Sequence, residues 1–455
     1  MTRLIAALAA LTPSGRAGVP VAWALYDFAN TIYSYAIVSF AMGLWVVDDA
    51  RLGAASGQFW FGVANAVSVG INAAVSPVLG AISDRGGRRL PYLAFFTAQT
   101  VVATAAIGLI ADGSGSGLAF LGLALFTIAN FSYQAALIYY DATLPVVSKP
   151  DTRGRVSGLG VAVGYLGTIV IAVLILLLGR LMPGSEDSSL TFLLTAALFA
   201  VFAVPIFRAV REQRTSDYRF RIGDALASWS QLAITIGHAR RVPGLLRFLV
   251  ARFFYTDPVN TVIVVMAVFA TEAIGFTQAE ANLVLLALTV AAVVASFGWG
   301  FLVERIGPKR TLMIVLGTWC VGLLIGGAIL SKPTFLIAGV LLGSGLGGVW
   351  TSDRVFMLRL SPRDRIGEFF GLYGLAGKFS AVTGPLLYGV IVSTMLDAGY
   401  GPVAYQAGIF SFLILMFVGV WLLRRVPDPG AEPHDVVAPP EHLLPSSDMP
   451  GPARH

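Results

Sequence analysis

Residues 80–89 read GAISDRGGRR, and residues 300–310, GFLVERIGPKR, repeat the same pattern 220 positions later. Both copies follow an apolar run that is long enough to cross a bilayer, which takes about 20 residues. A motif that recurs at a constant offset predicts a chain built from two similar halves. The shared positions are Gly80, Asp84, Arg85 and Gly87 in the first copy and Gly300, Glu304, Arg305 and Gly307 in the second.

Two further pairs of segments support this duplication. YDFANT (26–31) matches TDPVNT (256–261) at an offset of 230, which aligns the aspartate, asparagine and threonine of each copy. DTRGRVSGLGVAVG (151–164) has a weaker counterpart in DRIGEFFGLYGLAG (364–377). Because the three matches occur in the same order, they predict two six-helix halves related by a parallel repeat.

The composition is that of an integral membrane protein. Of 455 residues, 56% are hydrophobic and 12% are charged, and the mean hydropathy is +0.78, whereas soluble domains carry about 25% charged residues. Cys320 is the single cysteine, which excludes an internal disulfide. Apolar runs predict spans at 20–47, 57–82, 90–111, 118–141, 156–180, 189–208, 245–271, 278–303, 310–330, 334–357, 366–394 and 402–424.

The distribution of basic residues predicts the topology. Twelve spans place both termini on one side, and of 31 Lys and Arg residues only Arg51, Arg180 and Lys332 fall in connections on the other side. Arg252 and Lys378 lie inside spans. Because cytoplasmic loops carry the excess of basic residues, we expect both termini to be cytoplasmic. The positive charge then reflects topology, and we expect no nucleic-acid partner.

These features divide the chain into five parts. We expect a cytoplasmic N-terminal segment at 1–19, because a full span follows it at once and can direct insertion without a cleaved signal peptide. Two six-helix bundles follow at 20–208 and 244–425. The connector at 209–243 has helical apolar spacing and predicts an amphipathic helix on the membrane surface, with an irregular linker as the alternative. The Pro-rich tail at 426–455 is expected to be disordered.

The duplicated GAISDRGGRR motif resembles the signature of the major facilitator superfamily. The resemblance implies an all-α integral membrane fold in which twelve transmembrane helices form two pseudo-symmetric six-helix bundles. WALYDFANTIYSYAI (23–37), GRVSGLGVAVGYLGT (154–168) and GEFFGLYGLAGKFSAVTGPLLYG (367–389) resemble the branch that contains the fungal vacuolar amino-acid effluxers and their bacterial relatives.

This resemblance implies a secondary active transporter that moves an amino acid or similar zwitterion by alternating access. It also implies a multi-pass protein of the bacterial inner membrane with lipids around it, and we expect a monomer. We expect no cofactor and no metal site. H⁺ is the expected coupling ion, and Na⁺ stays open because carboxylate, Asn and Thr oxygens also suit it.

The repeated motif predicts a latch between the halves. Asp84 is placed to face the positive N-terminus of the helix that begins near Ile366, and Glu304 to face the helix that begins near Val156. Plain positive-inside charges would account for the basic residues but not for the repeated spacing of glycine and acid. The residues expected to act in gating, with the arginines pairing with these acids or with lipid headgroups, are Gly80, Asp84, Arg85, Gly87, Arg88, Glu304, Arg305 and Gly307.

Polar stripes on the spans predict a central binding site, because polar faces avoid lipid. Lys378 lies too deep to reach the interface and is expected to pair with Asp257 or Asp27. Either aspartate is a candidate for holding a substrate ammonium group or the coupling proton. The stripe of Asn65, Ser68, Asn72 and Ser76 is expected mainly to bond neighbouring helices. The candidate substrate- and ion-binding residues are Asp27, Asn30, Thr31, Tyr33, Ser34, Asn130, Gln134, Arg252, Asp257, Asn260 and Lys378.

Other functions remain as alternatives. No Walker loop, HExxH motif or nucleophile elbow occurs in the sequence, which disfavours an enzyme. A proton-linked exporter of drugs or lipids on the same fold is the strongest competing function. A membrane sensor that transports nothing is the third.

Overall fold

The computed structural model describes residues 2–182, 188–212 and 229–429. In this part of the chain twelve helical segments are long and apolar enough to cross a membrane, as the sequence predicts. Each observed end lies within four residues of the expected one. No strand occurs in the described residues, which confirms the predicted fold class.

The first half contains six spans after a short helix, α1 (Thr2–Ala10). The first span runs through α2 (Gly18–Tyr33), the π-helical η1 (Ser34–Ala41) and α3 (Met42–Val47). A one-turn helix, α7 (Leu144–Val147), follows the fourth span. The other spans are α4 (Ala54–Gly86), α5 (Leu90–Ile110), α6 (Ser116–Ala142), α8 (Arg153–Leu181) and α9 (Ser189–Ala209).

The second half repeats this plan. Its first span joins α12 (Leu245–Val268) to the π-helical η2 (Phe269–Ala273), so the first span of each half contains a π-helical segment. A short helix, η3 (Arg363–Arg365), precedes the fifth span of this half. The other spans are α13 (Gln278–Ile306), α14 (Pro308–Ala328), α15 (Lys332–Leu360), α16 (Ile366–Asp397) and α17 (Val403–Arg424).

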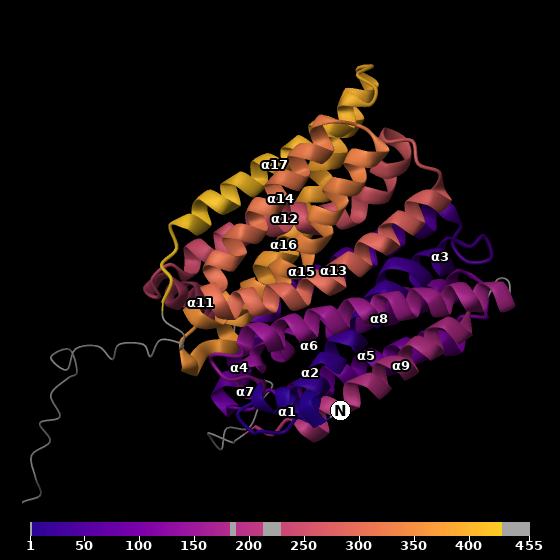
Figure 1. Ribbon diagram of the computed structural model, residues 1–455. Coiled ribbons are helices and arrows are strands. Elements are labelled where there is room, and N and C mark those ends of the chain that lie inside the picture. Colours follow the sequence, from indigo (N-terminus) through magenta and orange to yellow (C-terminus); the bar gives the residue numbers. More distant parts are fainter. Residues whose placement is uncertain (1, 183–187, 213–228, 430–455) are drawn as a thin grey trace, which may run out of the picture.

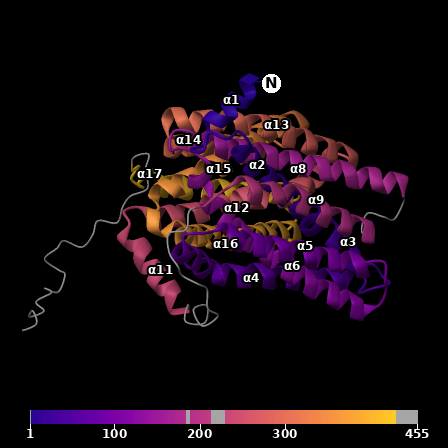
Figure 2. The same cartoon turned by 90° about the horizontal axis from the view of Figure 1, so that it is seen from below.

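The two halves form two bundles that lie side by side, as the colours in Figure 1 show. The bundles meet along two helix pairs, α4 with α16 and α8 with α13 (Figures 1 and 2). We call the membrane side on which α4 ends and α16 begins the terminal side, because the described chain starts and α17 ends there. Glycines permit the close approach: a Cβ on Gly158 would lie 2.6 Å from the carbonyl oxygen of Ser296.

The repeated glycines end helices in both halves. Gly87 follows α4 with φ of 62°, and Gly307 follows α13 with φ of 88°. Only glycine adopts such angles without steric cost, so the chain can turn at once into the next span. The glycines of the sequence motif therefore have a direct structural role.

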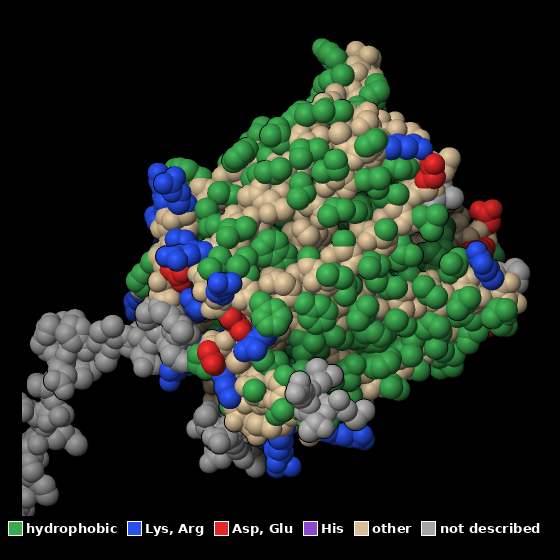
Figure 3. Space-filling model, viewed as in Figure 1, with side chains coloured by type: hydrophobic (Ala, Val, Ile, Leu, Met, Phe, Trp, Pro, Cys, Tyr) green, Lys and Arg blue, Asp and Glu red, His purple; other side chains and the backbone are tan. Residues whose placement is uncertain are grey.

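The surface is consistent with a membrane protein. Hydrophobic side chains cover most of the face in Figure 3, while Lys and Arg gather mainly along one edge. Exposed apolar residues such as Leu109, Val294 and Ile414 lie on spans and would contact lipid. The connector helix α11 (Trp229–Arg241) lies at the terminal side. The remainder of the predicted amphipathic segment, 213–228, and the tail from 430 onward lie outside the described residues.

Candidate functional site

A central cavity of about 550 Å³ lies between the two bundles. This volume falls in the range of small-molecule sites. Both halves contribute to its wall, as the repeat predicts. Eight of the candidate residues line it: Asp27, Asn30, Thr31, Ser34, Gln134, Arg252, Asn260 and Lys378.

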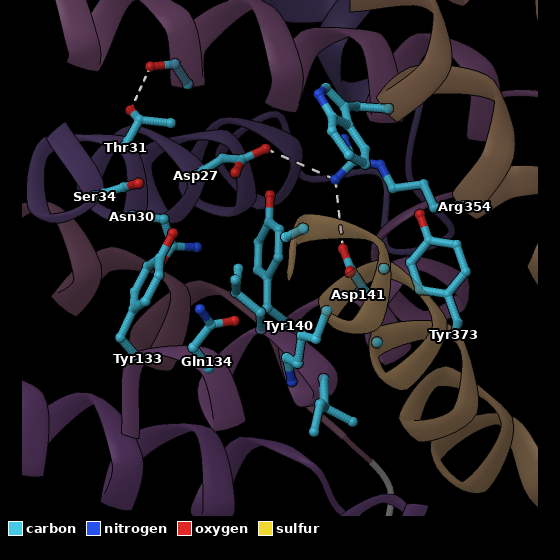
Figure 4. Close-up of a pocket in the computed structure, with 18 of the residues that line it drawn as sticks. Asp27, Asn30, Thr31, Ser34, Tyr133, Gln134, Tyr140, Asp141, Arg354 and Tyr373 are labelled. Atoms are coloured by element: carbon cyan, nitrogen blue, oxygen red, sulfur yellow. Dashed lines mark hydrogen bonds and ion pairs between the residues drawn. The ribbon is translucent and has the colours of Figure 1, made fainter. Parts of the chain in front are cut away.

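One wall of the cavity is built around Arg354 of α15. Its guanidinium lies 3.7 Å from Asp27 of α2 and 3.5 Å from Asp141 of α6, so a cation from the second half bridges two acids of the first (Figure 4). It also stacks over the ring of Trp23 at 4.7 Å. Two carboxylates share one guanidinium here, which leaves this wall with one negative charge when all three groups are ionised.

Glycine makes room for this ion pair. A Cβ on Gly160 of α8 would lie 3.2 Å from both Asp27 Oδ2 and an Arg354 guanidinium nitrogen. The backbone of α8 also supplies bonds, because Arg354 donates to the carbonyl oxygen and the hydroxyl of Ser157 at 2.5 Å each. Arg354 is thus fixed by the first half, although it belongs to the second.

Lys378 of α16 occupies another wall. Its ammonium group donates to the side-chain oxygen of Asn72 and, at 3.0 Å, to the hydroxyl of Ser76, both on α4. Among the described residues no carboxylate pairs with it, so the expected partnership with Asp257 or Asp27 is wrong. The amide and hydroxyl stripe of α4 does bond neighbouring helices, as expected: Asn72 and Ser76 accept from Lys378 of α16, and the other two members accept from Asn130 of α6.

Arg252 of α12 is neutralised by a residue that the sequence reasoning overlooked. Its guanidinium lies 3.2 Å from Asp353 of α15, donates to the carbonyl oxygen of Tyr373, and stacks over the Tyr373 ring at 3.5 Å. The hydroxyl of Tyr373 donates to Asp353 at 2.7 Å. This closed group adds no net charge to the cavity.

The cavity also contains an amide without a partner. Asn30 is 2% exposed, and neither its amide nitrogen nor its amide oxygen has a hydrogen-bond partner. It lies on the same helical face as Asp27 and Ser34 (Figure 4). A buried amide offers one acceptor and two donor hydrogens, and leaving them unsatisfied costs about 1–3 kcal/mol. Asn30 is therefore available to a polar solute.

Three candidate residues do not line the cavity. Tyr33 packs against the rings of Tyr133 and Phe199. Asn130 donates to Asn65 and Ser68 of α4, which fits the structural alternative for this stripe. Asp257 lies between α12 and α16, behind the cavity wall.

At the terminal side, Asp84 joins the two halves. Its carboxylate accepts the N–H groups of Gly367 and Glu368, at 2.9 and 2.8 Å, in the first turn of α16. This is the helix N-terminus that the sequence predicts. The guanidinium that pairs with Asp84 is that of Arg89, at 2.9 Å. A Cβ on Gly80 would collide with the carbonyl oxygen of Gly367, so the close approach requires glycine.

The second copy of the motif makes the equivalent contact. Glu304 accepts the N–H of Arg155 at 3.0 Å in the first turn of α8, and pairs with the Arg155 guanidinium at 2.6 Å. The pairing arginine thus comes from the opposite half and is not Arg305. Lys309 donates instead to the carbonyl oxygens of Arg424 and Val426 at the end of α17. The gating roles of Arg85, Arg88 and Arg305 stay predictions.

We call these two contacts between the halves, Asp84 with the start of α16 and Glu304 with the start of α8, the crossings. Residues near both ends of the connector contact the first crossing. The Glu212 carboxylate accepts the N–H groups of Arg89 and Leu90 at the start of α5. His238 of α11 lies 3.1 Å from the carboxylate of Glu368. Each contact involves a residue that also bonds Asp84.

The sequence reasoning missed Asp353 and Arg354. They stand in TSDRVF (351–356), close to the expected end of a span at 357, where charges commonly reach the interface. The helix continues to Leu360, so both charges lie more than a full turn before the end of α15. Two adjacent opposite charges on one apolar helix are a signal that could have indicated them.

Comparisons with known proteins agree with this architecture. The solved proton:xylose symporter XylE matches with a TM-score of 0.71 at 11% identity, covering 95% of this chain and 98% of that one. The human organic anion transporter MFSD10 matches with a TM-score of 0.66 at 16% identity, covering 92% and 99%. At such identities the likeness shows the fold. The chain is an integral membrane protein with the fold of a major facilitator transporter.

The family is narrower. The model of the family described as "Vacuole effluxer Atg22 like" matches residues 60–429, so the chain belongs to that family. A Bacillus subtilis (strain 168) relative, an uncharacterized MFS-type transporter named YxiO, is 28% identical over 416 residues, or 89% of this chain and 94% of that protein. Autophagy-related protein 22-2 of Aspergillus clavatus is 25% identical, but the match covers only 43% of its length.

Proposed function

We propose that this transporter carries a small zwitterion, an amino acid or a solute of the same charge pattern, by alternating access. The observation that carries the proposal is the separation of charge in the cavity. Asp27 and Asp141 share Arg354, which leaves an excess negative charge when all three groups are ionised, while Lys378, when protonated, adds a positive charge that has no carboxylate partner among the described residues.

A zwitterion complements both walls. Its ammonium group would contact Asp27 or Asp141, and its carboxylate would contact Lys378. The unsatisfied amide of Asn30 supplies further polar contacts. A purely apolar solute would leave these buried groups unpaired, which costs about 1–3 kcal/mol for each neutral group and more for charges. The wall is therefore better suited to a polar solute than to an apolar one.

Orientation follows from charge. We propose that the terminal side is cytoplasmic, in a bacterial inner membrane, because most basic residues lie there. The crossings at Asp84 and Glu304 would then hold the halves together on the cytoplasmic side while solute enters from outside. Breaking these crossings would expose the cavity to the cytoplasm. The direction of net flux would follow the driving gradients.

Counterflow in proteoliposomes tests the proposal. Vesicles loaded with unlabelled neutral amino acids should accumulate the same labelled amino acid, whereas an amine or a carboxylate that lacks the other group should exchange poorly. Exchange of none of these zwitterions, with export of apolar dyes instead, would refute the proposal and favour the exporter of drugs or lipids.

Lys378→Met is the matching variant. Loss of a charge-assisted hydrogen bond costs about 1.5–3 kcal/mol, which corresponds to an increase of about ten- to a hundredfold in the half-saturating concentration. Lys332→Met is the control, because Lys332 is exposed at the start of α15 and pairs with Glu280 outside the membrane core. Equal effects of the two variants would remove Lys378 from the binding site.

A further inference from the structure

Asp257 forms a second buried site, separate from the cavity. It is 2% exposed and lies between α12 and α16. Thr383 of α16 donates to one carboxylate oxygen at 3.0 Å, and the hydroxyl of Thr261, one turn along α12, lies 3.3 Å from the other. Both partners are neutral, so the carboxylate has hydrogen bonds but no compensating charge.

Charged residues on its own helix and on α16 are engaged elsewhere. Arg252 pairs with Asp353, and Lys378 bonds Asn72 and Ser76. Among the described residues no cation forms an ion pair with Asp257. This contrasts with Asp27, its counterpart in the duplication, which contacts Arg354.

Other titratable groups on the helices packed against α12 and α16 do not reach it either. Most of them lie at helix ends, at the terminal side, or in the ion pairs of Asp353 and Arg354 described above. The tyrosines make no hydrogen bond to Asp257. They are Asp84, Arg85, Tyr133, Tyr139, Tyr140, Asp141, His238, Arg240, Arg241, Arg247, Tyr255, Glu272, Glu280, Glu304, Arg305, Lys332, Asp353, Arg354, Arg359, Arg363, Asp364, Arg365, Glu368, Tyr373, Tyr388, Asp397, Tyr405 and Arg424.

The backbone of α16 lies close against the carboxylate at Gly384, while the neighbouring Thr383 is exposed. A Cβ on Gly384 would collide with Asp257 Oδ1 and with the hydroxyl of Thr261, so the carboxylate lies directly on the backbone of α16. The side chains at this site offer one carboxylate and two hydroxyls, fewer oxygens than the roughly six or more that hard cations such as Ca²⁺ and Mg²⁺ take. A proton needs no added space.

A proline lies inside each of these two helices, next to the Asp257 site. Pro258 follows Asp257 in α12, and Pro385 follows Gly384 in α16. A proline inside a helix removes one backbone hydrogen bond and favours a kink. The charge state of Asp257 thus bears on the contact between two helices at the positions where each bends most easily.

We propose that Asp257 is the site that binds the coupling proton, while its counterpart Asp27 serves the substrate. This inference rests on the proposed function. In the conformation seen here an ionised Asp257 would be a buried charge without a cation beside it, at a cost of about 2.5–3.5 kcal/mol on the lenient scale, so burial favours the protonated acid. Bending at the two prolines would admit water, and the O–H bond would then break and release H⁺ to the side that has opened.

The test separates exchange from coupling. Wild type and Asp257→Asn are reconstituted, and each is assayed for amino-acid counterflow and for accumulation driven by an imposed pH gradient. We expect the variant to keep counterflow within about threefold of wild type and to lose the driven accumulation. Asp397→Asn is the matched control, since Asp397 is an exposed aspartate at the C-terminal end of α16, away from the Asp257 site. It should retain both activities.

Either of two results would overturn the inference. One is driven accumulation that persists in Asp257→Asn, and the other is loss of counterflow in a monodisperse, folded variant. If the wild-type protein exchanges no zwitterion, the proposed function fails. The proton site is then tested by infrared spectroscopy, which needs no substrate. Infrared difference spectra on a pH change should show the C=O band of a protonated carboxyl in wild type and Asp397→Asn, reduced in Asp257→Asn. An undiminished band refutes the site.

Discussion

Removing the carboxylate of Asp84 should open the terminal side. The side chain of Asp84 is 7% exposed and accepts two N–H groups from α16, at 2.9 and 2.8 Å, besides its pair with Arg89. Those two N–H bonds are the ones that cross between the halves. Asp84→Ala therefore removes crossing contacts and leaves two backbone donors of the first turn of α16 unsatisfied.

The magnitude follows from these two bonds. Hydrogen bonds to a charged group contribute about 1.5–3 kcal/mol each, so the lower value gives about 3 kcal/mol for the pair. We use the lower value because water can hydrate the freed donors at the membrane surface. Since 1.4 kcal/mol is a factor of ten, the closed state should lose about a hundredfold in population relative to the open state.

Cysteine accessibility measures this change. Ser83 is fully buried, and a Cβ on Gly367 would lie 2.6 Å from its hydroxyl, so the side chain lies beneath α16. Ser83→Cys, in a background where the single native cysteine carries Cys320→Ser, should react with a maleimide only when the halves separate. The rate should rise by about a hundredfold on adding Asp84→Ala.

The control is Asp364→Asn, which changes an exposed carboxyl close to the start of α16 that pairs with Arg365. It should leave the reaction rate of Ser83→Cys unchanged. If Asp84→Ala changes that rate by less than about threefold, or if the control accelerates it equally, the carboxylate does not hold the halves together.

Three further changes probe the same region. Glu304→Ala should accelerate maleimide labelling of a cysteine buried under the start of α8 by about tenfold or less. Its partner Arg155 is partly solvent-exposed, and exposed ion pairs contribute about 0–1 kcal/mol. An acceleration larger than the one that Asp84→Ala causes at Ser83→Cys would contradict this ranking of the two contacts. Gly80→Ala should weaken the α4–α16 contact and lower thermal stability in detergent by several degrees, whereas an unchanged melting temperature would show that the helices can part at no cost. His238→Ala should raise the exchange rate of α11 amides in hydrogen–deuterium exchange, because it removes the contact with Glu368, and unchanged exchange would show that other contacts hold this helix.

Much of the terminal side could be predicted because it is local. Glycine, acid and glycine at fixed spacing define a helix end, a turn and a carboxylate, and the duplication indicates which helix start each acid faces. Asp84 and Glu304 therefore lie where the sequence places them. Arg155 could not be predicted as the partner of Glu304, because that pairing depends on how the two halves are packed.

The cavity was predictable in outline only. Polar stripes show which face of each span avoids lipid, so Asp27 and Lys378 were found. They do not show how neighbouring helices are rotated about their axes, and that rotation decides whether Lys378 meets an acid or the amide of Asn72. The same limit applies to Asp257, which does not line the cavity although Asn260 on the same helix does.

The bonds that form the proposed binding site also join the two halves. Arg354 belongs to the second half and contacts Asp27 and Asp141 of the first, while Lys378 of the second half bonds Ser76 of the first. A zwitterion that binds both walls would replace these direct contacts with contacts through itself. A ligand shifts a conformational equilibrium only by the difference in its affinity for the two states. Under the proposed function, that difference arises because a solute that displaces Arg354 and Lys378 from these partners removes contacts on which the present arrangement of the halves depends.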